Sequence, residues 1–143
     1  MQREKATIFL SYTSNQVSSG NREIIKFLVK QKKVHVLVTS AGGIEEDIIK
    51  CLKPFVLGQF DVPGKMLFDN GINRTGNIFV PNDRFAYFDK FMQEFFEKIY
   101  KIQKETGKVF CPSEFIRELG LAINDKSSIL YWAAKNDIPV FCP

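Results

Sequence analysis

The sequence predicts an α/β protein built on a parallel sheet with flanking helices, and three observations support this. Residues 7–52 alternate strand, polar loop, helix, strand, glycine loop and helix, an order typical of right-handed crossovers between parallel strands. The strand expected at 34–39 is nearly all apolar apart from His35, as in a parallel strand that is covered on both faces. Both strand-to-helix connections are rich in small polar residues and glycine, and ligands of open α/β sheets bind at such connections.

The first strand is expected at 7–10, where strand-forming residues precede a polar loop at 11–20. A helix is expected at about 21–32, because its apolar residues recur at helical spacing. On this helix Arg22 falls largely on the solvent side. The strand at 34–39 then returns the chain to the sheet.

A glycine loop at 40–43 follows, and a second helix is expected to begin near Ile44. Acidic residues suit the positive end of a helix dipole, and three of them fall in the expected first turn: Glu45, Glu46 and Asp47. Pro54 ends this helix. Residues 53–76 contain several prolines and glycines and are expected to form a long surface excursion, a kind of segment that is often functional in compact domains.

The second half is expected to contain two more strands and three more helices. The strands are expected at 77–80 and 138–141, and the helices at 83–106, 114–123 and 127–136. Ser113 is the expected N-cap of the second of these helices. Because an apolar strand of an α/β protein normally leads into a functional loop, we expect the natural protein to continue past Pro143. Residues 1–143 are then a single partial domain.

Composition narrows the class of protein. The 143 residues carry a net charge of +4, with 45% hydrophobic and 25% charged residues, as in ordinary globular proteins. The basic residues form no stripe interleaved with aromatic residues, so no nucleic-acid partner is expected. Three cysteines, Cys51, Cys111 and Cys142, lack zinc-ligand spacing and suggest reduced thiols. No run is apolar enough to span a membrane and no signal peptide opens the chain, so we expect a cytoplasmic protein.

Two strand ends could bind a ligand. The loop at 14–20 offers hydroxyls, amides and backbone N–H groups that could hold phosphate oxygens, and helix capping explains the same residues equally well. At the second end, Gly42 and Gly43 permit close approach of a ligand, although no GxGxxG fingerprint is present. Glu45 and Glu46 would repel a phosphate there and suit ribose hydroxyls or a cationic substrate, but acids are also commonplace in a first helical turn.

Four strings together resemble deoxyhypusine synthase in their order and spacing. They are TIFLSYTSN at 7–15, VLVTSAGGIEED at 36–47, GINRTGN at 71–77 and YWAAKNDIPVF at 131–141. The resemblance covers essentially the whole chain. It implies an incomplete Rossmann-like NAD-binding domain from an enzyme that oxidises spermidine with NAD. That enzyme transfers the aminobutyl group, through a lysine imine, to a lysine of a translation initiation factor precursor.

The resemblance also implies roles for individual residues. The positions matched to the NAD site are Ser14, Asn15, Gln16, Val17, Ser18, Ser40, Ala41, Gly42 and Glu46. Glu45 and Glu46 match acidic positions that face spermidine, in keeping with the need of a polycation for carboxylates held out of bulk water. The family further implies a homotetramer with its sites at subunit interfaces.

Some positions depart from the family pattern. Ser40 stands where the family usually has Thr, and Ser11 stands where Gly is expected. The family's nucleophilic lysine lies in a Trp-Gly-Lys context that this chain lacks, and Lys135 belongs to a different motif, so the chain alone is expected to be inactive. Two rival hypotheses remain. One is a non-catalytic paralogue that assembles with a catalytic subunit. The other is a different NAD-binding α/β protein, either a deacylase-like enzyme or a simple nucleotide-sensing module.

Overall fold

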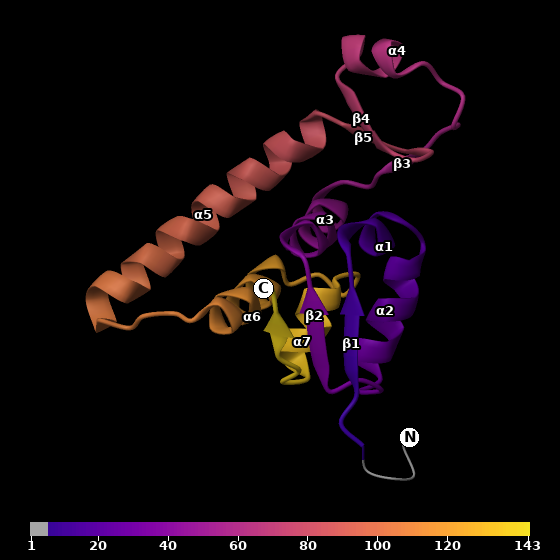
Figure 1. Ribbon diagram of the computed structural model, residues 1–143. Coiled ribbons are helices and arrows are strands. Elements are labelled where there is room, and N and C mark those ends of the chain that lie inside the picture. The colour runs from indigo at the N-terminus through magenta and orange to yellow at the C-terminus, as the bar shows by residue number, and fades with distance from the viewer. Residues whose placement is uncertain (1–5) are drawn as a thin grey trace.

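The computed structural model describes residues 6–143. Figure 1 shows a small parallel sheet with its helices, a second sheet that projects from it, and one long helix on the outside. The elements in chain order are β1 (Phe9–Tyr12), α1 (Ser14–Ser18), α2 (Asn21–Lys30), β2 (Val36–Thr39), α3 (Ala41–Leu52), β3 (Val56–Leu57), α4 (Gly64–Asp69), β4 (Ile72–Thr75), β5 (Ile78–Pro81), α5 (Asp83–Thr106), α6 (Pro112–Ile123), α7 (Ile129–Lys135) and β6 (Val140–Phe141).

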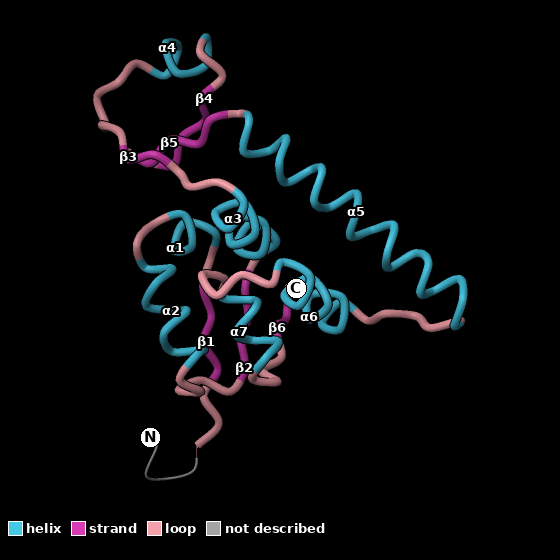
Figure 2. The backbone as a smooth tube through the Cα atoms, turned by 180° about the vertical axis from the view of Figure 1, so that it is seen from behind, coloured by secondary structure: helices cyan, strands magenta, loops and turns pink. Residues whose placement is uncertain are grey.

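The predicted parallel sheet is present, with the strand order β1-β2-β6. Its β1 and β2 pair in parallel from Phe9 beside Val36 to Tyr12 beside Thr39. One face of this sheet is covered: α7 lies behind the strands in Figure 1 and in front of them in Figure 2. Leu37 on this covered face is fully buried and belongs to the core shared by the sheet and its helices.

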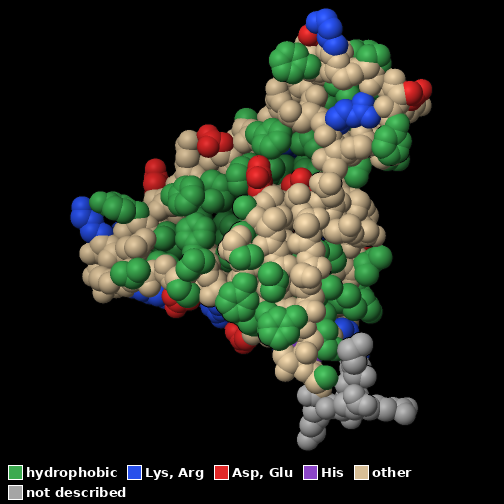
Figure 3. All heavy atoms as spheres, in the orientation of Figure 1, with side chains coloured by type: hydrophobic (Ala, Val, Ile, Leu, Met, Phe, Trp, Pro, Cys, Tyr) green, Lys and Arg blue, Asp and Glu red, His purple; other side chains and the backbone are tan. Residues whose placement is uncertain are grey.

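The other face of the sheet is open, so the expectation that both faces are covered was wrong. Phe9 is 65% exposed and Phe141 is 46% exposed, whereas Val36 and Val38 between them are only half-buried. Figure 3, which views the molecule from the side of Figure 1, shows apolar side chains gathered on this surface. The nearly continuous apolar run of β2 would allow both faces of the strand to be buried, but the described helices pack on one face only.

The predicted surface excursion contributes β3 and β4 to a second, antiparallel sheet with the strand order β3-β5-β4. The strand expected at 77–80 exists as β5, but it pairs with β3 and β4 and not with the parallel sheet. Gly76, with a φ of 59°, opens the two-residue connection between β4 and β5, and such a turn favours a hairpin. The Arg74 guanidinium donates to the carbonyls of Phe60 and Val62 and so ties the long loop to this hairpin.

Helix α5 confirms the longest predicted helix from end to end, including the left-handed Gly107 that ends it. Other boundaries differ. Part of the polar loop is helical as α1, and α3 begins at Ala41, so its acidic residues lie beyond the first turn. The N-cap of α6 is Cys111 and not Ser113, because Glu114 reaches back to the Cys111 backbone N–H. Within residues 6–143, no helix has the length and apolar character needed to cross a membrane.

A buried polar cluster joins α2, α3 and α7. The Asp47 carboxylate accepts hydrogen bonds from Arg22 Nε, from the Ser128 hydroxyl and from the backbone N–H groups of Ile129 and Leu130. Arg22, which the helical pattern placed on the solvent side, is only 4% exposed, so that expectation was wrong. Asp47 thus accepts from the backbone N–H groups at the start of α7 and links α3 to both α2 and α7.

Candidate functional site

The carboxyl ends of β1 and β2 lie side by side, as parallel pairing requires. Tyr12 and Thr39 are partners in the register, and the Thr39 hydroxyl donates to the Tyr12 carbonyl oxygen at 2.9 Å. Each strand leads directly into a helix, β1 into α1 and β2 into α3. The two polar segments singled out in the sequence therefore meet at one edge of the sheet.

Glycine makes this meeting possible. A Cβ on Gly42 would lie 2.9 Å from the Cβ of Ser14, and a Cβ on Gly43 would collide with the Thr39 hydroxyl. The starts of α1 and α3 can approach this closely because Gly42 has no side chain, and the missing side chain of Gly43 leaves room for the Thr39 hydroxyl. The two glycines lie inside the first turn of α3 and have no positive φ, so close packing, rather than backbone conformation, requires them.

Ser18 and Glu46 link the far end of α1 to α3. The Ser18 hydroxyl is within hydrogen-bonding reach of the Glu46 carboxylate and of the Ser14 carbonyl oxygen. Burial raises the pKa of Glu46 above its usual range, while the hydrogen bond from Ser18 partly opposes this rise. The site thus holds a half-buried carboxylate whose charged form is disfavoured by desolvation.

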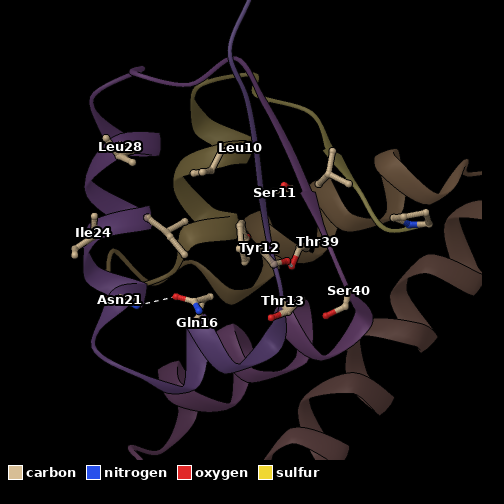
Figure 4. Close-up of a pocket in the computed structure, with 13 residues that line it drawn as sticks. Leu10, Ser11, Tyr12, Thr13, Gln16, Asn21, Ile24, Leu28, Thr39 and Ser40 are labelled. Atoms are coloured by element: carbon tan, nitrogen blue, oxygen red, sulfur yellow. Dashed lines mark hydrogen bonds between the residues drawn. The ribbon is translucent and has the colours of Figure 1, made fainter.

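A cavity of about 800 Å³ opens beside these strand ends. Figure 4 shows a polar end, where Thr13, Gln16, Asn21 and Ser40 gather, and an apolar end along α2 and β1. The Asn21 amide donates to the Gln16 amide oxygen at 2.7 Å. The apolar end is lined by Leu10, Ile24, Ile25, Leu28 and Val38. Its volume falls within the range of small-molecule sites.

Eight of the nine predicted NAD-site residues, all except Glu46, divide into three groups in the structure. Gln16 and Ser40 line the large cavity. Ser14 and Gly42 pack against each other, and Asn15 and Ala41 are exposed beside them. The side chains of Val17 and Ser18 are buried, Val17 completely and Ser18 to 3% exposure. The Val17 side chain belongs to the core, so only its backbone could reach a ligand.

Glu45 and Glu46 face a different part of the structure. Both line a cavity of about 210 Å³ with Arg74 and Phe55. Glu45 also lines a more apolar cavity of about 400 Å³, formed with α5 and α6. Neither acid lines the large cavity at the strand ends. The structure therefore brings Glu46 to Ser18 but leaves Glu45 on the side of α3 that faces α5.

Residues that the sequence analysis did not single out also contribute. Thr13 and Asn21 line the polar end of the cavity, and only their position at the ends of the predicted loop could have indicated this. Tyr12 lines it as well, and within residues 6–143 its buried hydroxyl has no hydrogen-bond partner. Burial, reinforced by nearby Asp47, raises the pKa of the Tyr12 phenol. Arg74 lies in the GINRTGN string at 71–77, which the sequence indicated only as part of the family resemblance.

Comparison with known proteins gives a consistent result. A protein-family model described as deoxyhypusine synthase matches residues 1–143. A Methanocaldococcus jannaschii protein assigned as deoxyhypusine synthase is 58% identical over 98% of this chain and 44% of its own length. A Drosophila melanogaster protein with the same assignment is 50% identical over 99% of this chain and 39% of its own length. The chain thus spans less than half the length of these relatives.

A solved structure agrees with the sequence matches. The crystal structure of an Entamoeba histolytica protein, described as a deoxyhypusine synthase, superposes with a TM-score of 0.73 at 33% identity. The superposition covers 96% of this chain and 40% of the other. The similarity therefore includes the excursion and the long helix as well as the parallel sheet.

Proposed function

Because this chain belongs to the deoxyhypusine synthase family, we propose that it forms part of a cytoplasmic, NAD-dependent transferase. The reaction moves the aminobutyl group of spermidine to a lysine of a translation initiation factor precursor. The observation that carries the proposal is the contact between the two strand ends, with Ser14 against Gly42 beside a large cavity.

We propose that the parallel strands form one half of a Rossmann-like dinucleotide-binding sheet. In the order β1-β2-β6 the first strand in sequence lies at one edge, as in half of a doubly wound sheet, where the cofactor binds at the carboxyl end of that strand. The polar end of the cavity, with Thr13, Gln16 and Ser40, is the proposed site for NAD. Its apolar end runs along the edge of β1 and is the proposed position of a further strand.

We propose that Glu45 and Glu46 bind the ammonium groups of the cationic substrate. Both carboxylates are half-buried, and a polyamine ammonium gains most from a carboxylate that is partly removed from water. Glu46 also contacts Ser18 of α1, so its side chain is the one best placed to contact both the cofactor and spermidine. Glu45, beside the more apolar cavity, is assigned to spermidine alone.

We further propose that the nucleophilic lysine comes from outside these residues. A Schiff-base lysine must present a free amine. Lys50 is the lysine beside the candidate site, and its Nζ already donates to three carbonyl oxygens. Lys135 is exposed on α7, next to the Tyr131 ring. The chain of 143 residues would then be inactive alone.

The proposed assembly is a homotetramer with its sites at subunit interfaces. Exposed apolar residues of the projecting sheet and of α4 support this, since Leu57 of β3 is 79% exposed and Phe68 of α4 is 82% exposed. Large exposed apolar surfaces commonly mark association sites. Mass photometry of the natural protein tests the assembly: a tetramer supports the proposal and a stable monomer rejects it.

The central test is calorimetric titration of the natural protein with NAD, with and without spermidine. We expect NAD to bind, and we expect spermidine to change its affinity, because both ligands contact neighbouring carboxylates. In the Glu45→Gln variant the effect of spermidine on NAD binding should be lost while NAD itself still binds. The matched control is Glu94→Gln, which alters an exposed acid on α5 and should leave both titrations unchanged. Absence of NAD binding would reject the proposal.

A further inference from the structure

The Lys50 side chain closes the carboxyl end of α1. Its Nζ donates to the Val17 and Ser18 carbonyl oxygens at 2.9 Å each and to the Ser19 carbonyl oxygen at 3.3 Å. The last carbonyls of a helix have no partner within the helix, and an ammonium group carries three donors and no acceptor. Ser19 supplies donors to the Asn15 and Gln16 carbonyl oxygens, and Lys50 supplies the donor to those of Val17 and Ser18.

Two residues of α3 hold α1 from one side. Glu46 and Lys50 are four residues apart in α3, so their side chains share one face of that helix. Glu46 accepts from the Ser18 hydroxyl, and Lys50 donates to the backbone around it. The start of α1 has no side-chain cap of its own. The orientation of α1 therefore depends strongly on α3.

The Lys50 ammonium is confined where it lies. The side chain is half-buried, and the Phe55 ring centroid is 5.6 Å from Nζ. Burial, with repulsion from Arg22 as the next cause, lowers the pKa of Lys50. The group gives up hydration in this position, and the carbonyls of α1 replace the lost water.

We propose that Lys50 is a positioning residue for the dinucleotide: it fixes the carboxyl end of α1 and thereby holds Ser14 against Gly42. This inference rests on the proposed function, because it assigns α1 to the NAD site. A short helix that is clamped at one end loses less conformational freedom when a ligand binds at the other end. Lys50 acts through α1 and does not touch the cofactor itself.

The test uses three variants of the protein as it is produced in the cell. Lys50→Met keeps the length of the side chain and removes its donors, and Lys50→Arg restores a cation with several donors. Lys53→Met is the matched control, because Lys53 ends the same helix but pairs with Asp83 and not with α1. The measurements are the NAD dissociation constant by calorimetry, amide hydrogen exchange of residues 14–19, and the thermal unfolding midpoint.

We expect Lys50→Met to weaken NAD binding about tenfold, as the loss of one ordering contact would, with faster exchange confined to 14–19. Lys50→Arg should recover most of the affinity, and Lys53→Met should match the parent. Unchanged NAD affinity in Lys50→Met overturns the inference, as does faster exchange spread evenly over the chain. If the parent protein binds no NAD, the proposed function fails. The exchange of 14–19 then reports separately whether Lys50 orders α1.

Discussion

Arg22 Nε donates to Asp47 Oδ1 across 2.8 Å, and both side chains are almost fully buried. Three further donors, from Ser128 and from the backbone of Ile129 and Leu130, complete the coordination of this carboxylate. Asp47 directly follows Glu45 and Glu46 in sequence. Of three consecutive acids, one therefore stabilises the fold from the inside, and the two before it remain half-exposed.

Replacing Asp47 by Asn should destabilise the fold severely. The carboxamide cannot accept from four donors, and Arg22 is left as a buried cation without its partner. Removing one member of a buried ion pair costs about 3–5 kcal/mol. Urea unfolding followed by circular dichroism measures the loss. The control is Asp69→Asn, in an exposed pair with Lys65, whose unfolding midpoint should match the parent. Equal midpoints for the two variants would contradict the prediction.

Replacing Gly120 by Ala should separate α6 from α7. A Cβ at this position would collide with the backbone carbonyl of Leu130, which cannot rotate away as a side chain can. Overpacking of this kind costs about 1–3 kcal/mol. Gly64→Ala is the matched control, because no atom lies within 4 Å of its added Cβ. Thermal unfolding of both variants decides the matter, and a Gly120→Ala protein as stable as Gly64→Ala would refute the packing argument.

Replacing Glu46 by Gln should stabilise the folded chain at neutral pH. Burial raises the pKa of Glu46 above its ordinary value of 4.5 in the folded state, so the folded chain protonates this carboxyl more readily than the unfolded chain does. The associated stability is present below pH 4.5 and is lost as the pH rises through the folded pKa. Gln stays neutral and can still accept from Ser18.

The measurement is the thermal midpoint of the parent and of Glu46→Gln between pH 4 and pH 8. The variant should have the higher midpoint at pH 7, and the two should converge at the acid end. A variant that is less stable than the parent at pH 7 would show that the charged carboxylate is the favoured partner of Ser18.

Alkylation should distinguish the cysteines. Burial raises the pKa of Cys51 to about 11, so about one thiol in a thousand is ionised at pH 8, and the thiolate is the reactive form. Cys111 is exposed and should react with iodoacetamide first. Peptide mass spectrometry of the native protein over time gives the order. Equal labelling rates in native protein would show that Cys51 is more accessible than the structure indicates, and labelling in urea serves as the control.

Local pattern predicted the regular elements well where many residues shared one signal. Apolar residues at helical spacing followed by Gly107 defined α5 in full. The meeting of the two strand ends was also predictable, because parallel strands end at the same edge of a sheet. The antiparallel sheet was missed even though Gly76 and Asn77 form a two-residue connection between strand-forming runs, which is a hairpin signal. The many glycines and prolines of residues 53–76 favoured an irregular loop over this hairpin.

Other features depend on partners that are distant in the sequence. Arg22 lies on the polar side of its own helix, and only Asp47, 25 residues later, explains its burial. The contacts of Lys50 with the carbonyls of α1 cross about 30 residues in the same way and leave no periodic trace. A short apolar strand such as β2 also has the same sequence pattern whether one or both of its faces are covered. These are properties of packing, which no single segment encodes.

The exposed side of the parallel sheet, with Phe9 and Phe141, has a consequence for the stability of the chain. Any molecule that covers those rings in the folded state would bind the folded chain in preference to the unfolded one, and by mass action it would add to the apparent stability. The unfolding midpoint of the chain should consequently rise with protein concentration or with added partner. A free energy of unfolding measured for this chain should therefore be stated together with the protein concentration and any binding partner that was present.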